Sequence, residues 1–314
     1  MASLFVIVIS ETEKEEWMLM TTYKLFVSDM DGTILHNHTK IAPETAEIVR
    51  AAEEQGIRFA IATGRNYFNA KEILDEVGLT CPIVSSNGGR VLTETGDVLH
   101  EIDLTTEEAL EVVSVLHQDH KYSDVFYEMY SEAGLVASRL DLIDATMENL
   151  KQNGDERSLE MYEFFRKRYY VNEDVRLVED IEDFIKNEAG RVYKFIAFSS
   201  HFEKMSSLWT EIDERVEGVY ITSSGNDNIE VMANGADKGH GIKKLAEHFG
   251  VDLSEVVVIG DNLNDIPMFE VAGKAIAMGN SHEDLIAISH HVTERHDEYG
   301  VANALKRVMT GEWK

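Results

Sequence analysis

The sequence is poor in cysteine and in basic residues. Its 314 residues include one cysteine, Cys81, so an internal disulfide is excluded and a reducing compartment such as the cytoplasm is expected. Lys and Arg number 29 against 58 Asp and Glu, which gives a formal net charge of −29. A field of that sign repels nucleic acid and anionic membranes, so we expect neither as a partner.

Long hydrophobic runs are also lacking. The apolar stretch within residues 1–22 is too short to span a bilayer, has no basic flank and runs into acidic residues, so a signal peptide is not expected. We interpret residues 1–22 as an extension ahead of a domain that begins near Tyr23, with Met18 or Met20 as an alternative start. A hydrophobic content of 44% is typical of a globular protein, and the chain length favours two domains.

Strands and helices alternate at both ends of the chain. Short apolar runs predict buried strands, and segments with Gly or Pro at their ends predict helices. The expected strands are 23–29, 57–65, 82–86, 256–261 and 274–279, and the expected helices are 43–56, 69–78, 237–250, 265–273 and 281–289, the last with a capping box from Ser281 to Asp284. This alternation predicts an α/β domain with a parallel, doubly wound sheet, formed by residues 23–102 and 233–314.

Residues 103–232 have a different pattern. A helix with a possible capping box from Thr105 to Glu108 is followed by an alternating, hairpin-like stretch at 124–138. A charged helical region at 141–170, a strand at 193–199 and a hairpin at 219–232 with a Gly-Asn turn come next. We therefore predict an α+β domain inserted between the two halves of the α/β domain.

Four short motifs fall at predicted strand ends or helix starts, where open parallel sheets bind their ligands. They are DMDGT at 29–33, ATGR at 62–65, ADKG at 236–239 and GDNLND at 260–265. If the strands are neighbours, Asp29, Asp31, Asp261 and Asp265 converge at one sheet edge. Carboxylates that close together must take up protons or bind a metal, and oxygen ligands favour Mg²⁺.

Each of these residues has a plainer interpretation when taken alone. Asp29 could be only a turn former, with Gly32 and Thr33 completing a sharp, locally hydrogen-bonded exit from the strand. Lys238 could be a solvated surface charge, although a cation at a helix start is disfavoured by the helix dipole and calls for an anionic partner. We interpret His36 and His38 as exposed loop residues, and we assign no metal to His290, His291 or His296.

Taken together and in this order, the four motifs resemble those of the haloacid-dehalogenase-like hydrolase superfamily. The inserted domain and the SSNGG segment after the third strand make residues 23 to about 310 similar to a Cof-type phosphatase with an α+β (C2-type) cap. The resemblance implies that Asp29 is the nucleophile and that Asp31 protonates the leaving oxygen and then activates water. Thr63 and Lys238 would assist the chemistry.

The same resemblance implies a binding site for a phosphoryl group and for Mg²⁺. The backbone N–H of Met30 and residues Thr63, Gly64, Lys238 and Asn264 would hold the phosphoryl group. Mg²⁺ would be held by Asp29, the backbone carbonyl of Asp31, and Asp261, with Asn262 or Asp265 beside it.

The expected function is a Mg²⁺-dependent phosphatase that hydrolyses small phosphomonoesters, sugar phosphates or related metabolites, through an aspartyl-phosphate. A carboxylate at position 31 can activate water, which favours turnover over storage of phosphate. Two alternatives stay open: a phosphohexomutase or phosphotransferase of the same superfamily, and a non-catalytic phosphate sensor. The sequence indicates no oligomeric state.

Overall fold

A computed structural model describes residues 23–36, 39–117, 121–154, 156–170, 175–199, 202–224 and 228–313. The chain forms two compact units. The first consists of residues up to 85, 91–99 and those from 238 on, and the second of residues 86–90 and 100–237. The second unit therefore also includes five residues that directly follow the third strand. The expected extension at 1–22, the Gly-Asn turn of the last hairpin, and His38 lie outside the described residues.

The first unit contains an eight-stranded sheet in the order β14-β13-β12-β1-β2-β3-β4-β5. β1 pairs in parallel with both β2 and β12, so residues that are 231 positions apart in the sequence, such as Leu25 and Val256, lie next to each other. Parallel pairing continues from β2 to β3 and from β12 through β13 to β14. The strands are β1 Leu25–Ser28, β2 Arg58–Ala62, β3 Ile83–Ser85, β4 Arg90–Leu92, β5 Val98–Glu101, β12 Val256–Gly260, β13 Lys274–Ala277 and β14 His291–Val292.

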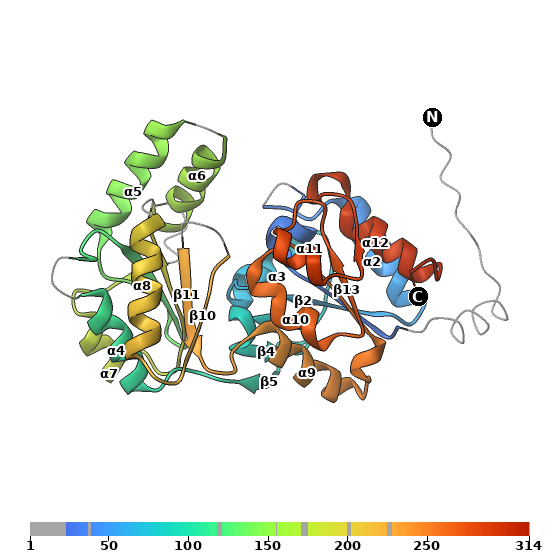
Figure 1. Cartoon of the computed structure of the whole chain (residues 1–314), viewed down its shortest axis with the longest axis horizontal. Helices are drawn as coiled ribbons and strands as arrows, with labels where there is room; N and C mark the ends of the chain where they lie inside the picture. Colours follow the sequence, from blue (N-terminus) through green and yellow to red (C-terminus); the bar gives the residue numbers. More distant parts are fainter. Residues whose placement is uncertain are drawn as a thin grey trace. The chain divides into compact units, whose positions relative to one another are not determined.

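Helices cover both faces of this sheet (Figure 1). Successive residues of β1 alternate between the faces, so Phe26 packs into one hydrophobic cluster and Val27 into the other. The Phe26 face is covered by α2 Pro43–Glu54, α3 Tyr67–Glu76 and α12 Gly300–Met309. The Val27 face is covered by α9 Lys238–Phe249, α10 Ile266–Val271 and α11 Glu283–Ile288. The predicted α/β fold with a doubly wound parallel sheet is confirmed.

Helix starts follow local hydrogen bonding. The capping box of α4 (Thr106–Leu116) is present, because Thr105 Oγ1 accepts from the N–H of Glu108 and the Glu108 carboxylate accepts from the N–H of Thr105. The capping box expected from Ser281 is wrong. Ser281 Oγ donates instead to the carbonyl of Gly260, and the N-cap of α11 is His282, whose Nδ1 accepts from the N–H of Asp284.

The second unit contains a six-stranded sheet in the order β10-β11-β9-β6-β7-β8, antiparallel except for the pair β7 and β8. Helices α4, α7 and α8 pack on one face, whereas the side-by-side helices α5 and α6 contact the other (Figure 1). The elements are β6 Phe126–Ser131, β7 Gly134–Ala137, β8 Val175–Leu177, β9 Val192–Phe198, β10 Val219–Thr222, β11 Asn228–Ala233, α5 Leu140–Asn153, α6 Glu156–Tyr170, α7 Ile181–Asn187 and α8 Phe202–Arg215. No helix in the described ranges combines the length and apolarity needed to cross a bilayer.

Among the described residues of the second unit, two buried carboxylates form ion pairs. Lys194 Nζ of β9 lies 3.0 Å from Glu230 Oε2 of β11, and each side chain is only 2% exposed. The remaining Glu230 oxygen accepts a hydrogen bond from Ser224. Arg168 of α6 similarly binds Glu128 of β6 at 2.7 Å. Each buried carboxylate therefore has a cation and a further donor within the same unit.

Candidate active site

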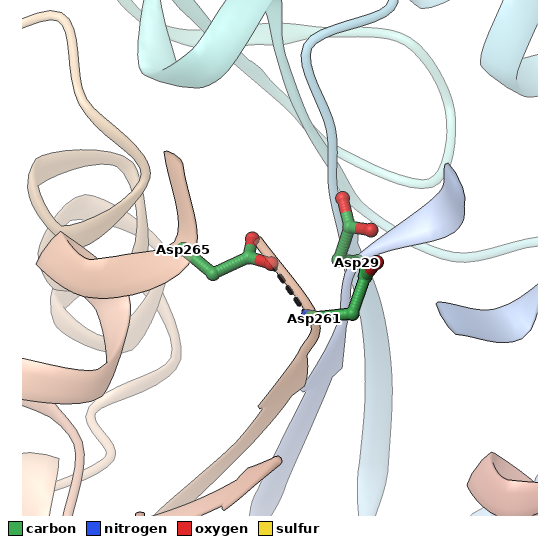
Figure 2. A group of neighbouring side chains, drawn as sticks. All are labelled: Asp29, Asp261 and Asp265. Carbon is green, nitrogen blue, oxygen red and sulfur yellow. Dashed lines mark hydrogen bonds between the residues drawn. The ribbon is translucent and has the colours of Figure 1, made fainter. Parts of the chain in front are cut away.

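Three carboxylates meet at the carboxyl ends of two neighbouring strands of the first unit (Figure 2). Asp29 follows β1 and Asp261 follows β12, and the N–H of Asp29 donates to the carbonyl of Ile259 at 3.0 Å. Asp265 ends the short 3₁₀ turn Leu263–Asp265 opposite them. One oxygen from each residue lies within 4.8 Å of the other two, so the parallel register of β1 and β12 brings together side chains from distant motifs.

Lys238, the first residue of α9, is completely buried among these carboxylates. Its Nζ lies 2.6 Å from Asp29 Oδ1 and 2.6 Å from Asp265 Oδ1. Asp265 Oδ2 in turn accepts the N–H groups of Asp261 and Asn262 at 2.8 and 3.0 Å. Asp265 therefore has donors on both oxygens, whereas the ammonium group of Lys238 pairs with only two of the three acidic residues.

The cluster contains more acidic groups than basic groups, and the pKa values of its side chains are shifted as a result. Burial raises the pKa of Asp29 to about 7, because Lys238 offsets only part of this effect and Asp265 and Asp31 add to it. Burial and the neighbouring Asp29 also raise the pKa of Asp261. Although burial disfavours the charged form of Lys238, Asp265 and Asp29 outweigh burial and raise its pKa. An excess of buried negative charge on oxygen ligands fits a divalent cation such as Mg²⁺.

Gly32 and Thr33 shape the Asp261 side of this cluster. Gly32 has a φ of +73°, and a Cβ atom there would lie 2.3 Å from Asp261 Oδ2, so a larger residue would displace the carboxylate. Thr33 was expected to hold the turn by a local hydrogen bond. Its Oγ1 donates instead to Asp261 Oδ1 at 2.9 Å, which connects the loop after β1 to the loop after β12.

Asp31 does not join the three-carboxylate cluster. Its side chain is 50% exposed and forms a two-pronged ion pair with Arg65, with Nε 2.7 Å from Oδ2 and the second terminal nitrogen 2.6 Å from Oδ1. Arg65 also donates to Asn69 Oδ1 at 2.8 Å, which anchors its guanidinium on α3. Arg65 lies within the ATGR motif, and no role was expected for it, although Arg is a typical two-pronged partner of a carboxylate.

The remaining expected site residues lie near these strand ends. Thr63 is buried just after β2, and its Oγ1 accepts the N–H of Arg65 at 3.1 Å, with Gly64 between them. Asn262 is the N-cap of the 3₁₀ turn and accepts the N–H of Leu263 at 2.8 Å. Asn264 is buried in that turn, and the side chain of Met30 is buried in the core, which leaves only its backbone for a ligand.

The histidines near these strand ends form structural contacts with the backbone or with an aromatic ring. His36 is partly buried and stacks on Tyr299 with ring centroids 5.0 Å apart, so the expectation of an exposed loop histidine is wrong for this residue. His290 Nδ1 accepts the N–H of Ala275 at 3.0 Å, and His296 Nδ1 lies 3.1 Å from the carbonyl oxygen of His36.

Comparison with known proteins agrees with this arrangement. Residues 26–305 match the family model described as haloacid dehalogenase-like hydrolase. The chain is 28% identical over 289 residues to phosphatase YwpJ of Bacillus subtilis, covering 91% of this chain and all of that protein. It is 30% identical over 300 residues to 5-amino-6-(5-phospho-D-ribitylamino)uracil phosphatase YwtE of the same organism, covering 92% of this chain and 99% of the relative.

Solved structures show the same similarity. A haloacid dehalogenase-like hydrolase from B. subtilis superposes with a TM-score of 0.78 at 28% identity, covering 90% of this chain and 99% of that one. Another from Bacteroides thetaiotaomicron superposes with a TM-score of 0.71 at 26% identity, covering 91% and 99%. The chain belongs to the haloacid dehalogenase-like hydrolase family. Within that family it is a Cof-type phosphatase.

Proposed function

We propose that this phosphatase depends on Mg²⁺ and hydrolyses small phosphomonoesters, such as sugar phosphates or related metabolites, through an aspartyl-phosphate. The observation that carries the proposal is the unbalanced cluster of Asp29, Asp261 and Asp265 around Lys238. The relative YwtE, named for a phosphorylated ribityl metabolite, supports the substrate class. A cytoplasmic location is part of the proposal, as is the lack of nucleic-acid or membrane partners that the net charge of −29 favours.

Asp29, Asp261 and the backbone carbonyl of Asp31 would hold the Mg²⁺. Asp265 would support the site by orienting Lys238 and the N–H groups after β12, since donors engage both of its oxygens. Asn262, which caps the following turn, would lie beside the ion. Bound Mg²⁺ would offset the negative charge of the phosphoryl group as it approaches Asp29.

The ionised Asp29 carboxylate would attack phosphorus while the bond from phosphorus to the ester oxygen breaks. Asp31 would give its proton to the leaving oxygen. In the second half-reaction Asp31 would take a proton from water, whose oxygen attacks phosphorus and releases Asp29 and inorganic phosphate. The N–H of Met30, the Thr63 hydroxyl and Gly64, together with Lys238 and Asn264, would bind the phosphoryl oxygens.

The test is phosphate release from a panel of small phosphomonoesters, with Mg²⁺ and with a chelator. Asp29→Asn is compared with Asp75→Asn, which removes an exposed carboxylate that is paired with Lys71 on α3. We expect Mg²⁺-dependent release from the wild type and from Asp75→Asn, and none from Asp29→Asn. Release that survives chelation would contradict the metal dependence. Phosphate transfer to an added sugar in place of release would instead identify a phosphotransferase or mutase.

A further inference from the structure

The loop after β13 contacts Asp261 through its backbone. The N–H of His282 donates to the carbonyl of Asp261 at 2.9 Å, and Ser281 Oγ donates to the carbonyl of Gly260 at 3.1 Å. Since β13 is the neighbour of β12 on the side away from β1, this loop lies at the same sheet edge as the carboxylates. The loop therefore holds the end of β12 from its outer side.

The Asn280 side chain extends this contact to the loop after β1. Its Nδ2 donates to the carbonyl of Gly32 at 2.9 Å and lies 3.4 Å from Asp261 Oδ2. Its Oδ1 accepts the N–H of His296 at 3.0 Å. This orientation of the amide is unambiguous, because a backbone N–H can only donate and a carbonyl can only accept.

Donors therefore approach both oxygens of Asp261. Thr33 binds Oδ1 and Asn280 lies at Oδ2, with Gly32 packed against the carboxylate between them. Asn280 also fixes the carbonyl of Gly32, one peptide away from the Asp31 carbonyl. One amide thus contacts Asp261, which would bind the metal, and the peptide next to the Asp31 carbonyl, which would also bind it.

We propose that Asn280 is a positioning residue for the metal site, which orients Asp261 and the Gly32 peptide without contacting substrate. This inference rests on the proposed function, because it assumes a divalent cation at Asp29 and Asp261. Groups that orient metal ligands typically change affinity 10–100-fold when removed. No sequence motif includes Asn280, and its three contacts come from residues 16 to 248 positions away.

The experiment is a titration of metal-free protein with Mn²⁺, followed by electron paramagnetic resonance, on the wild type, Asn280→Ala and Asn303→Ala. Asn303 of α12 is a matched control, because its side-chain amide also donates to a backbone carbonyl, that of Glu298 in the preceding turn, outside the site. We expect Asn280→Ala to raise the Mn²⁺ Kd about 10–100-fold. We expect Asn303→Ala to leave this Kd unchanged. The number of ions bound at saturation counts folded sites, so partial misfolding lowers that number and leaves the Kd unchanged.

Steady-state kinetics gives a second readout. If Asn280 positions the metal ligands, the activity lost in Asn280→Ala recovers as Mg²⁺ is raised, and KM for the ester at saturating Mg²⁺ stays near the wild-type value. An unchanged Mn²⁺ Kd in folded Asn280→Ala overturns the inference. The proposed function fails separately: wild-type protein that binds Mn²⁺ and releases no phosphate would refute hydrolysis, and the effect of Asn280 on Kd would still be measurable.

Discussion

Each unit of this protein buries a lysine that is paired with a buried acidic side chain, and the surroundings of the two lysines differ in their charge. In the second unit, Lys194 faces Glu230, and Ser224 and Asn87 donate to the same carboxylate. In the first unit, Lys238 is shared between Asp29 and Asp265, with Asp261 close by. The first cluster thus has more negative than positive charge, whereas the pair in the second is matched.

The pKa values of the carboxylates show the consequence. Burial alone would raise the pKa of Glu230, but Lys194 and the neighbouring donors outweigh burial and lower it. The pKa of Asp29 is instead raised to about 7. A buried ion pair with complete hydrogen bonding needs nothing from solution, whereas a cluster with excess charge must take up a proton or a cation. This difference supports the first cluster as the candidate ligand site without reference to any motif.

The largest effect on activity is expected when one of the three clustered carboxylates, that of Asp29, is removed. Asp29→Asn should lower kcat by at least about 10⁴-fold, because it removes the proposed nucleophile. The same variant should unfold at an equal or higher temperature than the wild type without metal at pH 8, since one buried negative charge is gone. Phosphate release and thermal unfolding check both parts. Near-normal turnover in the folded variant would refute the assignment.

The two lysines allow a direct comparison. Lys194→Met and Lys238→Met should each destabilise the protein by about 3–5 kcal/mol at pH 8, because each leaves a buried carboxylate without its cation. Millimolar Mg²⁺ should restore part of the stability lost in Lys238→Met and none of that lost in Lys194→Met. Denaturant unfolding with and without Mg²⁺ measures this. Equal responses of the two variants to Mg²⁺ would refute the contrast between the clusters.

The raised pKa of Asp29 predicts how stability depends on pH. The folded protein holds a proton on Asp29 that the unfolded chain releases near pH 4, so this contribution to stability is complete below pH 4 and lost as pH rises through about 7. Without metal, the Tm of the wild type relative to Asp29→Asn should therefore fall between pH 5 and pH 8, by about 2–4 °C per kcal/mol. Mg²⁺ should remove the decrease. A difference in Tm that is independent of pH would contradict the prediction.

A smaller effect is expected at the exposed ion pair. Arg65→Ala should lower kcat about tenfold, equivalent to about 1.4 kcal/mol, because Asp31 loses the guanidinium that holds its carboxylate in one orientation. Arg65→Lys should recover little of this activity, since an ammonium group cannot form the two-pronged contact. Stability should change little, since half of the Asp31 side chain is exposed. A loss of stability as large as that of Lys238→Met would show that Arg65 acts on the fold.

The sequence was sufficient for the features that depend on local pattern. Apolar runs predicted the central strands, and the positions of Asp29 and Asp261 at strand ends predicted that they meet. Contacts between distant segments could not be predicted in this way. Neither the donation of Thr33 to Asp261 nor the contact of Asn280 with Gly32 has a signal in sequence spacing. The pairing of Arg65 with Asp31 depends on the distance between two strand ends, which the motifs leave undetermined.

One missed element did carry a local signal. The last helix, α12, was not predicted, although Val301, Leu305 and Val308 are buried at the spacing of a helical stripe. Its first residue, Gly300, follows Tyr299, which has a φ of +60° in place of the extended conformation usual at an N-cap. The helix is amphipathic and regular, but its N-terminus lacks the usual capping residue that would have indicated where it begins.

The position of β1 between β2 and β12 has a consequence for synthesis of the chain. In the pairing of β1 with β12, Ser28 lies opposite Ile259. The whole second unit is therefore translated before β12 is available to pair with β1. At about 5–20 residues per second, this interval lasts on the order of 10–50 s. During it the nascent chain holds an apolar strand with an open edge, the kind of surface that pairs with other chains. The insertion that divides the first unit thus delays both its folding and the assembly of its active site.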